Sequence, residues 1–192
     1  MELIDALGVA RGEFEARLAT VKPDHWDRPT PCSDWTVGAL VTHVVVGCRM
    51  AVALLAGSSA DEAFTAARSA PPLGAGDDLM GEFVSAADAQ EAAFGKDGAL
   101  TRTVHHRVGD MPGGQLLEFR TSDYVLHTWD LARAVGADEH LDAELVALIW
   151  EGMVPMAPMM GKTGQFGAGP SGSLGEDAPL QARLLDLSGR RP

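Results

Sequence analysis

The chain has 192 residues, enough for one domain with a continuous core, and we predict a single domain over residues 1–192. Its 15 basic and 27 acidic residues give a net charge of −12, which argues against nucleic acid and anionic membranes as partners, because both need basic patches. Two cysteines, without a CxxC motif, and an acidic start without a secretory signal predict a cytoplasmic protein.

Alanine, leucine and valine dominate the composition, so we predict an all-α or mainly α fold. The first predicted helix covers residues 3–21, where apolar side chains recur every three or four positions. Residues 24–35 form a proline-punctuated connection, and its two tryptophans, Trp26 and Trp35, should lie against the protein. Thr36 is a suitable N-cap for the next helix.

The second predicted helix, residues 37–56, is almost continuously apolar, which raises the alternative of a membrane span. We reject that alternative because the run contains His43 and Arg49, has two glycines, and is followed by no further hydrophobic segment. His43 shares its helix face with apolar residues and so points inward. A lone inward histidine is more often a hydrogen-bonded core residue than a metal ligand, so this helix alone leaves both interpretations open.

Residues 57–76 are predicted to be a linker with a short helix at 61–68, ended by Pro71-Pro72. A third long helix is expected over 77–94 with Asp77 as its cap.

Residues 101–108 are rich in β-branched side chains and predict an extended segment. The adjacent His105 and His106 would face opposite ways on it, which disfavours them as joint metal ligands. Asp110 and Pro112 then resemble the start of the next helix.

Within that next helix, the stretch of residues 121–136 carries the clearest chemical signal, and the helix should end at Gly136 in a left-handed C-cap. Asp123 and His127 are four residues apart, so a carboxylate and an imidazole project from one face with their Cβ atoms roughly 6 Å apart. Apolar residues share this face. An unpaired carboxylate among them would cost several kcal/mol, so it needs a metal, a cationic partner or water.

Facing helices of a bundle lie about 8–10 Å apart, so His43 can complete a site formed by Asp123 and His127. We predict that these three residues bind one divalent ion. The alternative is that the three polar side chains are buried and hydrogen-bonded to one another. Asp130, one turn beyond His127, is either an acceptor that orients the imidazole or a surface or capping residue.

After Gly136, a helix is predicted over residues 142–160, kinked or ended by Pro155 and Pro158, with methionines that fill gaps in the core or line an adaptable pocket. Gly161-Lys-Thr163 resembles the tail of a phosphate-binding loop, but the required earlier glycine and preceding strand are missing. We expect coil over 164–175 and a further helix over 178–189.

Three segments in order carry a family resemblance: Pro29-Thr-Pro-Cys-Ser-Asp-Trp-Thr-Val37 with Leu40-Val-Thr-His43, then Asp123-Tyr-Val-Leu-His-Thr-Trp-Asp-Leu-Ala-Arg-Ala-Val-Gly136, then Glu176-Asp-Ala-Pro-Leu-Gln-Ala-Arg-Leu-Leu-Asp-Leu-Ser-Gly-Arg190. Together they resemble the actinobacterial branch of the DinB-like superfamily, best known from the N-terminal metal-binding domain of mycothiol-dependent maleylpyruvate isomerases. The resemblance implies a four-helix bundle with long connections and a divalent metal on His43, Asp123 and His127. The chain differs from the isomerase in two ways. It has the shorter aspartate at position 123, where the isomerase resembles a form with glutamate, and it lacks the isomerase's second domain.

The leading functional hypothesis is a metal-dependent thiol S-transferase or isomerase of the mycothiol type, acting on a small electrophilic substrate. Zinc is the first choice for two histidines and a carboxylate, with nickel or iron(II) as alternatives. The metal would lower the pKa of a thiol such as mycothiol, so no protein nucleophile is needed. Cys32 and Cys48 should therefore stay reduced and have packing roles, while Tyr124 and Arg49 are weaker candidates for substrate contacts.

The competing hypothesis is a non-catalytic protein of the same superfamily that binds a divalent metal or a small ligand. A stress-associated bundle that acts as a homodimer belongs to this class. A metal with a closed coordination shell would favour it, and an exchangeable water beside an open cavity would favour the enzyme.

Overall fold

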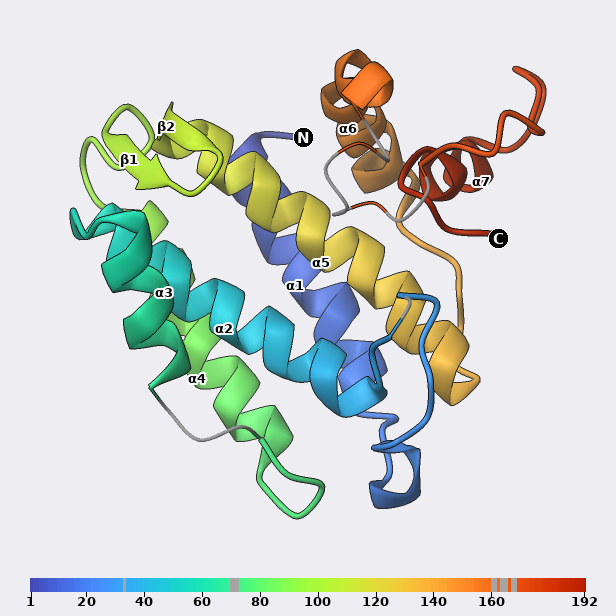
Figure 1. Ribbon diagram of the computed structural model, residues 1–192, viewed down its shortest axis with the longest axis horizontal. Helices are drawn as coiled ribbons and strands as arrows, with labels where there is room; N and C mark the ends of the chain where they lie inside the picture. Colours follow the sequence, from blue (N-terminus) through green and yellow to red (C-terminus); the bar gives the residue numbers. More distant parts are fainter. Residues whose placement is uncertain (33, 70–72, 160–161, 163–165, 167–168) are drawn as a thin grey trace.

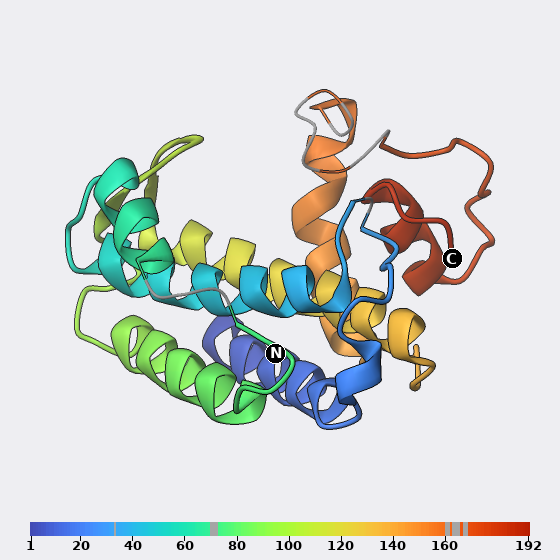
Figure 2. The same ribbon diagram turned by 60° about the horizontal axis from the view of Figure 1, so that its bottom comes forward.

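The computed structural model describes the chain except residues 33, 70–72, 160–161, 163–165 and 167–168. Four helices form a bundle (Figures 1 and 2), and they are α1 (Leu3–Leu18), α2 (Val37–Leu55), α4 (Leu79–Phe94) and α5 (Gly113–Val135). Helix α2 packs between α4 and α5, and α1 closes the ring by contacting the same two helices. The predicted all-α, DinB-like bundle is confirmed, and the one sheet among the described residues is a two-stranded hairpin.

Capping side chains set the ends of several helices. Thr36 accepts a hydrogen bond from the Ala39 backbone N–H at 3.2 Å, as predicted for the start of α2. The predicted cap of α4 was wrong by one residue, because Asp78 accepts the bond from the Gly81 N–H while Asp77 accepts one from Gly74 in the preceding turn. Helix α5 ends at Gly136, as predicted, and the φ of +75° at this residue is a conformation that glycine adopts without strain.

The hairpin consists of β1 (Thr103–His106) and β2 (Gly109–Pro112). The prediction that Asp110 and Pro112 open the following helix was wrong for Asp110, which pairs with His105 within the hairpin. It holds for Pro112, the last residue of β2, which is also the N-cap of α5. Helix α5 begins at Gly113, where a Cβ would overlap the backbone carbonyl of Ala99. This close approach of two backbone segments needs glycine, and it fixes where the helix starts.

The remaining elements are short. Pro23–His25 forms a 3₁₀ turn (η1) in the first connection. Helix α3 (Ala60–Arg68) confirms the short helix that was predicted at 61–68. The predicted helix 142–160 is divided into α6 (Ala143–Met153) and a 3₁₀ segment, η2 (Val154–Met159), and α7 (Leu180–Leu187) follows. The predicted stop at Pro71-Pro72, the ends of the Gly161–Thr163 motif and part of the 164–175 coil lie outside the described residues.

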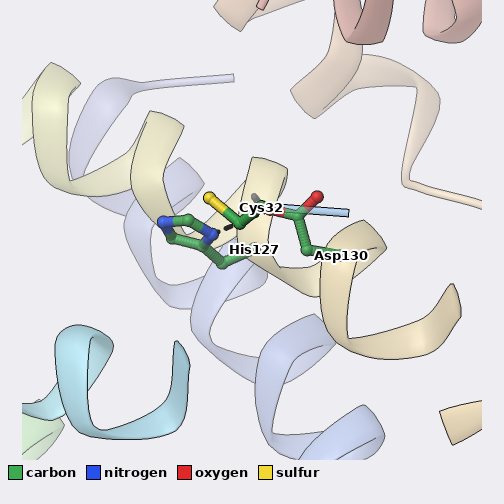
Figure 3. Close-up of side chains that lie close together, drawn as sticks. All are labelled: Cys32, His127 and Asp130. Carbon is green, nitrogen blue, oxygen red and sulfur yellow. Dashed lines mark hydrogen bonds and ion pairs between the residues drawn. The ribbon is translucent and has the colours of Figure 1, made fainter. Parts of the chain in front are cut away.

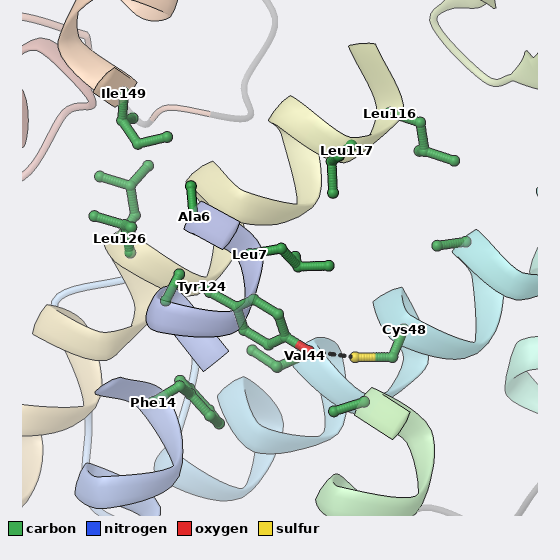
Figure 4. Close-up of a cluster of buried hydrophobic side chains, with 14 of the residues drawn as sticks. Ala6, Leu7, Phe14, Val44, Cys48, Leu116, Leu117, Tyr124, Leu126 and Ile149 are labelled. Atoms are coloured by element: carbon green, nitrogen blue, oxygen red, sulfur yellow. Dashed lines mark hydrogen bonds between the residues drawn. The ribbon is translucent and has the colours of Figure 1, made fainter. Parts of the chain in front are cut away.

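Helix α2 is long and apolar enough, by length and composition, to cross a membrane, but 56% of its apolar window is buried inside the structure. Its buried residues belong to the same core cluster as those of α1, α4 and α5. At the centre of this core the Tyr124 hydroxyl lies 3.0 Å from the Cys48 Sγ (Figure 4) and accepts a hydrogen bond from Gln90. The predicted packing role of Cys48 agrees with this position, and Tyr124 is completely buried.

Candidate metal centre

The structure brings together the three side chains predicted as metal ligands. His43 reaches from α2 toward Asp123 and His127 on α5, and its Nε2 lies 3.2 Å from the Asp123 Oδ1. The His127 Nε2 lies 3.3 Å from the same oxygen. One ligand atom from each residue falls within 4.8 Å of the other two.

The distances between these nitrogen and oxygen atoms fit those expected between two ligands of one metal ion. With metal–nitrogen and metal–oxygen bonds of about 2.1 Å, two ligands of a tetrahedral zinc site are about 3.4 Å apart. Direct N–H···O hydrogen bonds are usually shorter, with a mode of about 2.9–3.0 Å. Two imidazole nitrogens and one carboxylate oxygen are also a donor set that zinc accepts, so these residues fit a divalent ion.

His127 is oriented by Asp130, whose Oδ2 lies 2.9 Å from the His127 Nδ1. Asp130 is completely buried, so its interpretation as a surface residue was wrong and its interpretation as an orienting acceptor agrees with the structure. When Nδ1 donates its proton to this carboxylate, the lone pair of a neutral imidazole lies on Nε2, which faces Asp123. Such a lone pair beside a carboxylate oxygen needs a cation between them, either a proton or a metal ion.

Asp123 has the cationic partner that the sequence left open, and that partner is Arg120. The Arg120 guanidinium donates to the Asp123 Oδ2 at 2.7 Å, so it leaves Oδ1 free to face the histidines. The same buried guanidinium donates to the Gln90 side chain and to the Val44 carbonyl. Sequence reasoning missed Arg120, although its position three residues before Asp123 on one helix was a usable signal.

The local charges fix the ionisation of both α5 ligands. Burial alone would raise the pKa of the Asp123 carboxyl, but the charge of Arg120, with His43 and His127, holds that pKa well below its usual range. Burial alone would lower the pKa of His127, but Asp123 and Asp130 raise it above its ordinary value. Asp123 is therefore a carboxylate at neutral pH, and His127 attracts a positive charge to its Nε2.

Trp35 covers one side of the centre. Its ring centroid lies 4.5 Å from that of His43 and 5.6 Å from that of His127. The preceding residue, Asp34, has a φ of +70° and is the one non-glycine residue with positive φ in the described part of the chain. The side chain of His43 is 39% exposed, against 7% for His127, so the centre opens toward solvent on the α2 side.

A second group of ligand-type side chains, Cys32, His127 and Asp130, lies beside the first (Figure 3). Both Asp130 oxygens accept hydrogen bonds from Arg190, at 3.1 and 2.6 Å, so this carboxylate already has a cationic partner. Burial, with the nearby Asp130, raises the pKa of the Cys32 thiol to about 11, which keeps the thiol neutral at physiological pH. The His43 group is therefore the better metal site.

The two weaker candidates for substrate contacts do not lie at this centre. The Tyr124 hydroxyl is directed into the core, as described above. Arg49 pairs with Glu82 of α4 at 2.6 Å, whereas the centre lies between α2 and α5. The burial of Tyr124 contradicts its candidacy, because a helix presents the residue next to a ligand on a different face. Arg49, six positions after His43, also lies on a different face of its helix, and its candidacy stays a prediction.

The affinity for metal should depend on pH, because a proton and a metal compete for His127. Its pKa in the metal-free protein is raised above about 6.5 by Asp123 and Asp130, despite burial. Since only the neutral imidazole can ligate, the apparent association constant should fall about tenfold per pH unit as pH drops through this raised pKa. Zinc titrations at roughly pH 5 to 9 check this result. A constant affinity over that range would contradict it.

Comparisons with known proteins show the family to which the chain belongs. The family model "Mycothiol maleylpyruvate isomerase N-terminal domain" matches residues 7–132, which hold all three candidate ligands. The chain belongs to this family. Two uncharacterised proteins of Mycobacterium tuberculosis, from strains CDC 1551 / Oshkosh and ATCC 25618 / H37Rv, are each 34% identical to the chain over 136 residues, covering 71% of it and 69% of their own length.

Two solved structures share the fold of this family member. A crystal structure of the mycothiol-dependent maleylpyruvate isomerase has a TM-score of 0.51, with 68% of this chain and 61% of that chain covered. The structure of a mutant of that enzyme has a TM-score of 0.58 and covers 88% and 74%. Both are 17% identical to the chain, so they bear on the fold alone.

Proposed function

We propose that this mycothiol-isomerase-family protein binds one divalent ion, with zinc as first choice, on His43, Asp123 and His127, and that it uses the ion to activate a low-molecular-weight thiol of the mycothiol type. The thiol would then react with a small electrophile in a transfer or isomerisation. The observation that carries the proposal is the convergence of the two Nε2 atoms on the Asp123 Oδ1, at 3.2 and 3.3 Å. The family membership supports the choice of thiol.

The charges around the centre favour anionic ligands from outside. Arg120 balances the partly buried Asp123, and Arg190 balances the buried Asp130, so the two ion pairs are together neutral. Two neutral imidazoles and a divalent ion would add a charge of +2 that the described residues next to the centre do not offset. A thiolate, or the carboxylate of a substrate, would supply the missing negative charge.

The chain's own residues would prepare this reaction in separate ways. Asp130 keeps the His127 Nε2 directed at the centre, and Arg120 keeps the Asp123 Oδ1 there. Trp35 shields one side from water, and the exposed edge of His43 leaves room for a small molecule to enter. A bound zinc ion would lower the pKa of a coordinated thiol, so that a thiolate is available at neutral pH.

Activity should therefore require a thiol and a metal together. We would load the protein with zinc or cobalt, add mycothiol, and follow its conjugation to an activated alkene, in which the sulfur adds to one alkene carbon and a proton to the other. Chelation should abolish turnover while leaving the helical content intact, because the large apolar core does not depend on the ion. The cobalt absorption spectrum should change when mycothiol is added.

The His43→Ala variant, treated in the same way, is the control for reaction in solution. If the loaded protein binds its ion but mycothiol neither changes the cobalt spectrum nor supports any conjugation above that control, the protein is a metal-binding protein without this activity.

A further inference from the structure

We infer that Arg190, close to the C-terminus, is a positioning residue for the metal centre and acts on His127 through Asp130. The inference rests on the proposed function, since it assigns a role toward the same ion. It extends the centre to a segment 63 positions beyond His127 (190 − 127) that sequence spacing does not connect with it.

The first step is the contact between Asp130 and His127. The Asp130 Oδ2 is 2.9 Å from the His127 Nδ1, and both side chains are buried. A metal-ligating histidine commonly donates its second ring N–H to such a carboxylate, which fixes the ring orientation and raises the basicity of the ligand nitrogen.

The second step is the contact between Arg190 and Asp130. Its guanidinium donates through Nε to Oδ1 at 3.1 Å and through a terminal nitrogen to Oδ2 at 2.6 Å, a two-point contact that fixes the plane of the carboxylate. Arg190 itself is 7% exposed, and its other terminal nitrogen donates to the Ser188 carbonyl. Within the described part of the chain, the hydrogen bonds of the Arg190 side chain therefore go to Asp130 or to its own segment.

The third step is the anchoring of that segment. The Arg190 backbone N–H donates to the Leu185 carbonyl at 2.9 Å, which ties it to the end of α7. Leu184, Leu185 and Leu187 of α7 are buried in the core cluster. Because α7 is fixed by packing, Arg190 offers a rigid support to Asp130 rather than a mobile surface charge.

The next residue, Arg191, gives a matched control. It carries the same charge, but its side chain donates to Asp186 and to the backbone carbonyls of Gly169 and Arg190, and it is 52% exposed. A substitution there removes one positive charge from the same segment without touching Asp130.

The experiment compares Arg190→Gln and Arg190→Lys with Arg191→Gln in the full-length protein. Zinc affinity is measured by competition with a chromophoric chelator, and cobalt absorption reports the ligand geometry. Arg190→Gln should weaken zinc binding roughly tenfold or more and change the cobalt spectrum, as expected for loss of support to a ligand. Arg191→Gln should match the unchanged protein, and Arg190→Lys should recover part of the affinity. Equal affinities and spectra for Arg190→Gln and the unchanged protein would overturn the inference.

A second measurement separates failure of the inference from failure of the proposed function. In metal-free protein, NMR of the His127 Nδ1–H should show a ring proton protected from solvent, and Arg190→Gln should make it exchange faster. If the unchanged protein binds no divalent ion, the proposed function fails, and this ring proton alone decides whether Arg190 positions His127. If the ring proton is equally protected in both proteins, the positioning role is wrong.

Discussion

Replacing His43 by alanine should lower the affinity for zinc by more than about 100-fold, and Asp123→Ala and His127→Ala should do the same. Loss of a residue that only hydrogen-bonds to a metal ligand costs roughly 10–100-fold in metal affinity, so loss of a ligand itself should cost more. Each of these residues supplies one of three ligand atoms that lie within 4.8 Å of one another. The measurement is metal content after equilibrium dialysis, with circular dichroism to verify the fold.

The Cys32→Ser variant distinguishes between the two possible metal sites, both of which contain His127. If the ion lies on His43, Asp123 and His127, this variant should keep its metal, because the Cys32 thiol is neutral at physiological pH, with its pKa raised to about 11 mainly by burial. Full occupancy in His43→Ala together with metal loss in Cys32→Ser would instead place the ion on the Cys32 group. Loss in His127→Ala alone would not distinguish them.

The sequence predicted the long helices and the three candidate ligands because these features depend on local periodicity, whereas the four-helix bundle was implied by the family resemblance. The spacing of Asp123 and His127 on one helix, and the inward face of His43, need only the geometry of an α-helix. The capping of α2 by Thr36 and of α5 by Gly136 is similarly local. The predicted cap of α4 was wrong by one residue because two acidic residues stand side by side there. The second strand was missed because the chain reverses before Gly109, which begins that strand with a φ of +126°.

The residues that position or cover the candidate ligands could not be predicted in the same way. Arg190 reaches Asp130 across 60 residues, and Trp35 reaches His43 from an irregular loop. Neither contact follows from periodicity, because each depends on how a connection or terminal helix packs on the finished bundle. Arg120 is an intermediate case, since its pairing with Asp123 is local but its burial depends on a glycine of the facing helix.

That glycine is Gly47 of α2, where an added Cβ would overlap the Arg120 guanidinium. The arginine cannot move without cost, because it is bound to Asp123, Gln90 and the Val44 carbonyl. Gly47→Ala should therefore loosen the Arg120–Asp123 pair. Removing one partner of a buried ion pair costs roughly 3–5 kcal/mol, which is the upper limit for the expected loss in the free energy of unfolding.

Gly8→Ala and Gly12→Ala on the exposed face of α1 are the matched controls. An added Cβ at either position meets nothing within 4 Å, so alanine should stabilise the helix by about 0.5–1 kcal/mol. Urea unfolding of the metal-free proteins measures the difference, and zinc titration should show weaker binding in Gly47→Ala only. A Gly47→Ala protein as stable as the two controls would contradict the prediction.

A double variant tests whether the cost arises through Arg120 itself. Arg120→Met removes the guanidinium that the new methyl group would displace, so Gly47→Ala should cost little in that background. The loss of unfolding free energy in the double variant should then be smaller than the sum of the two single losses, the coupling expected for residues in contact. Additive losses would mean that alanine at position 47 destabilises α2 for a different reason and that the site does not depend on this glycine.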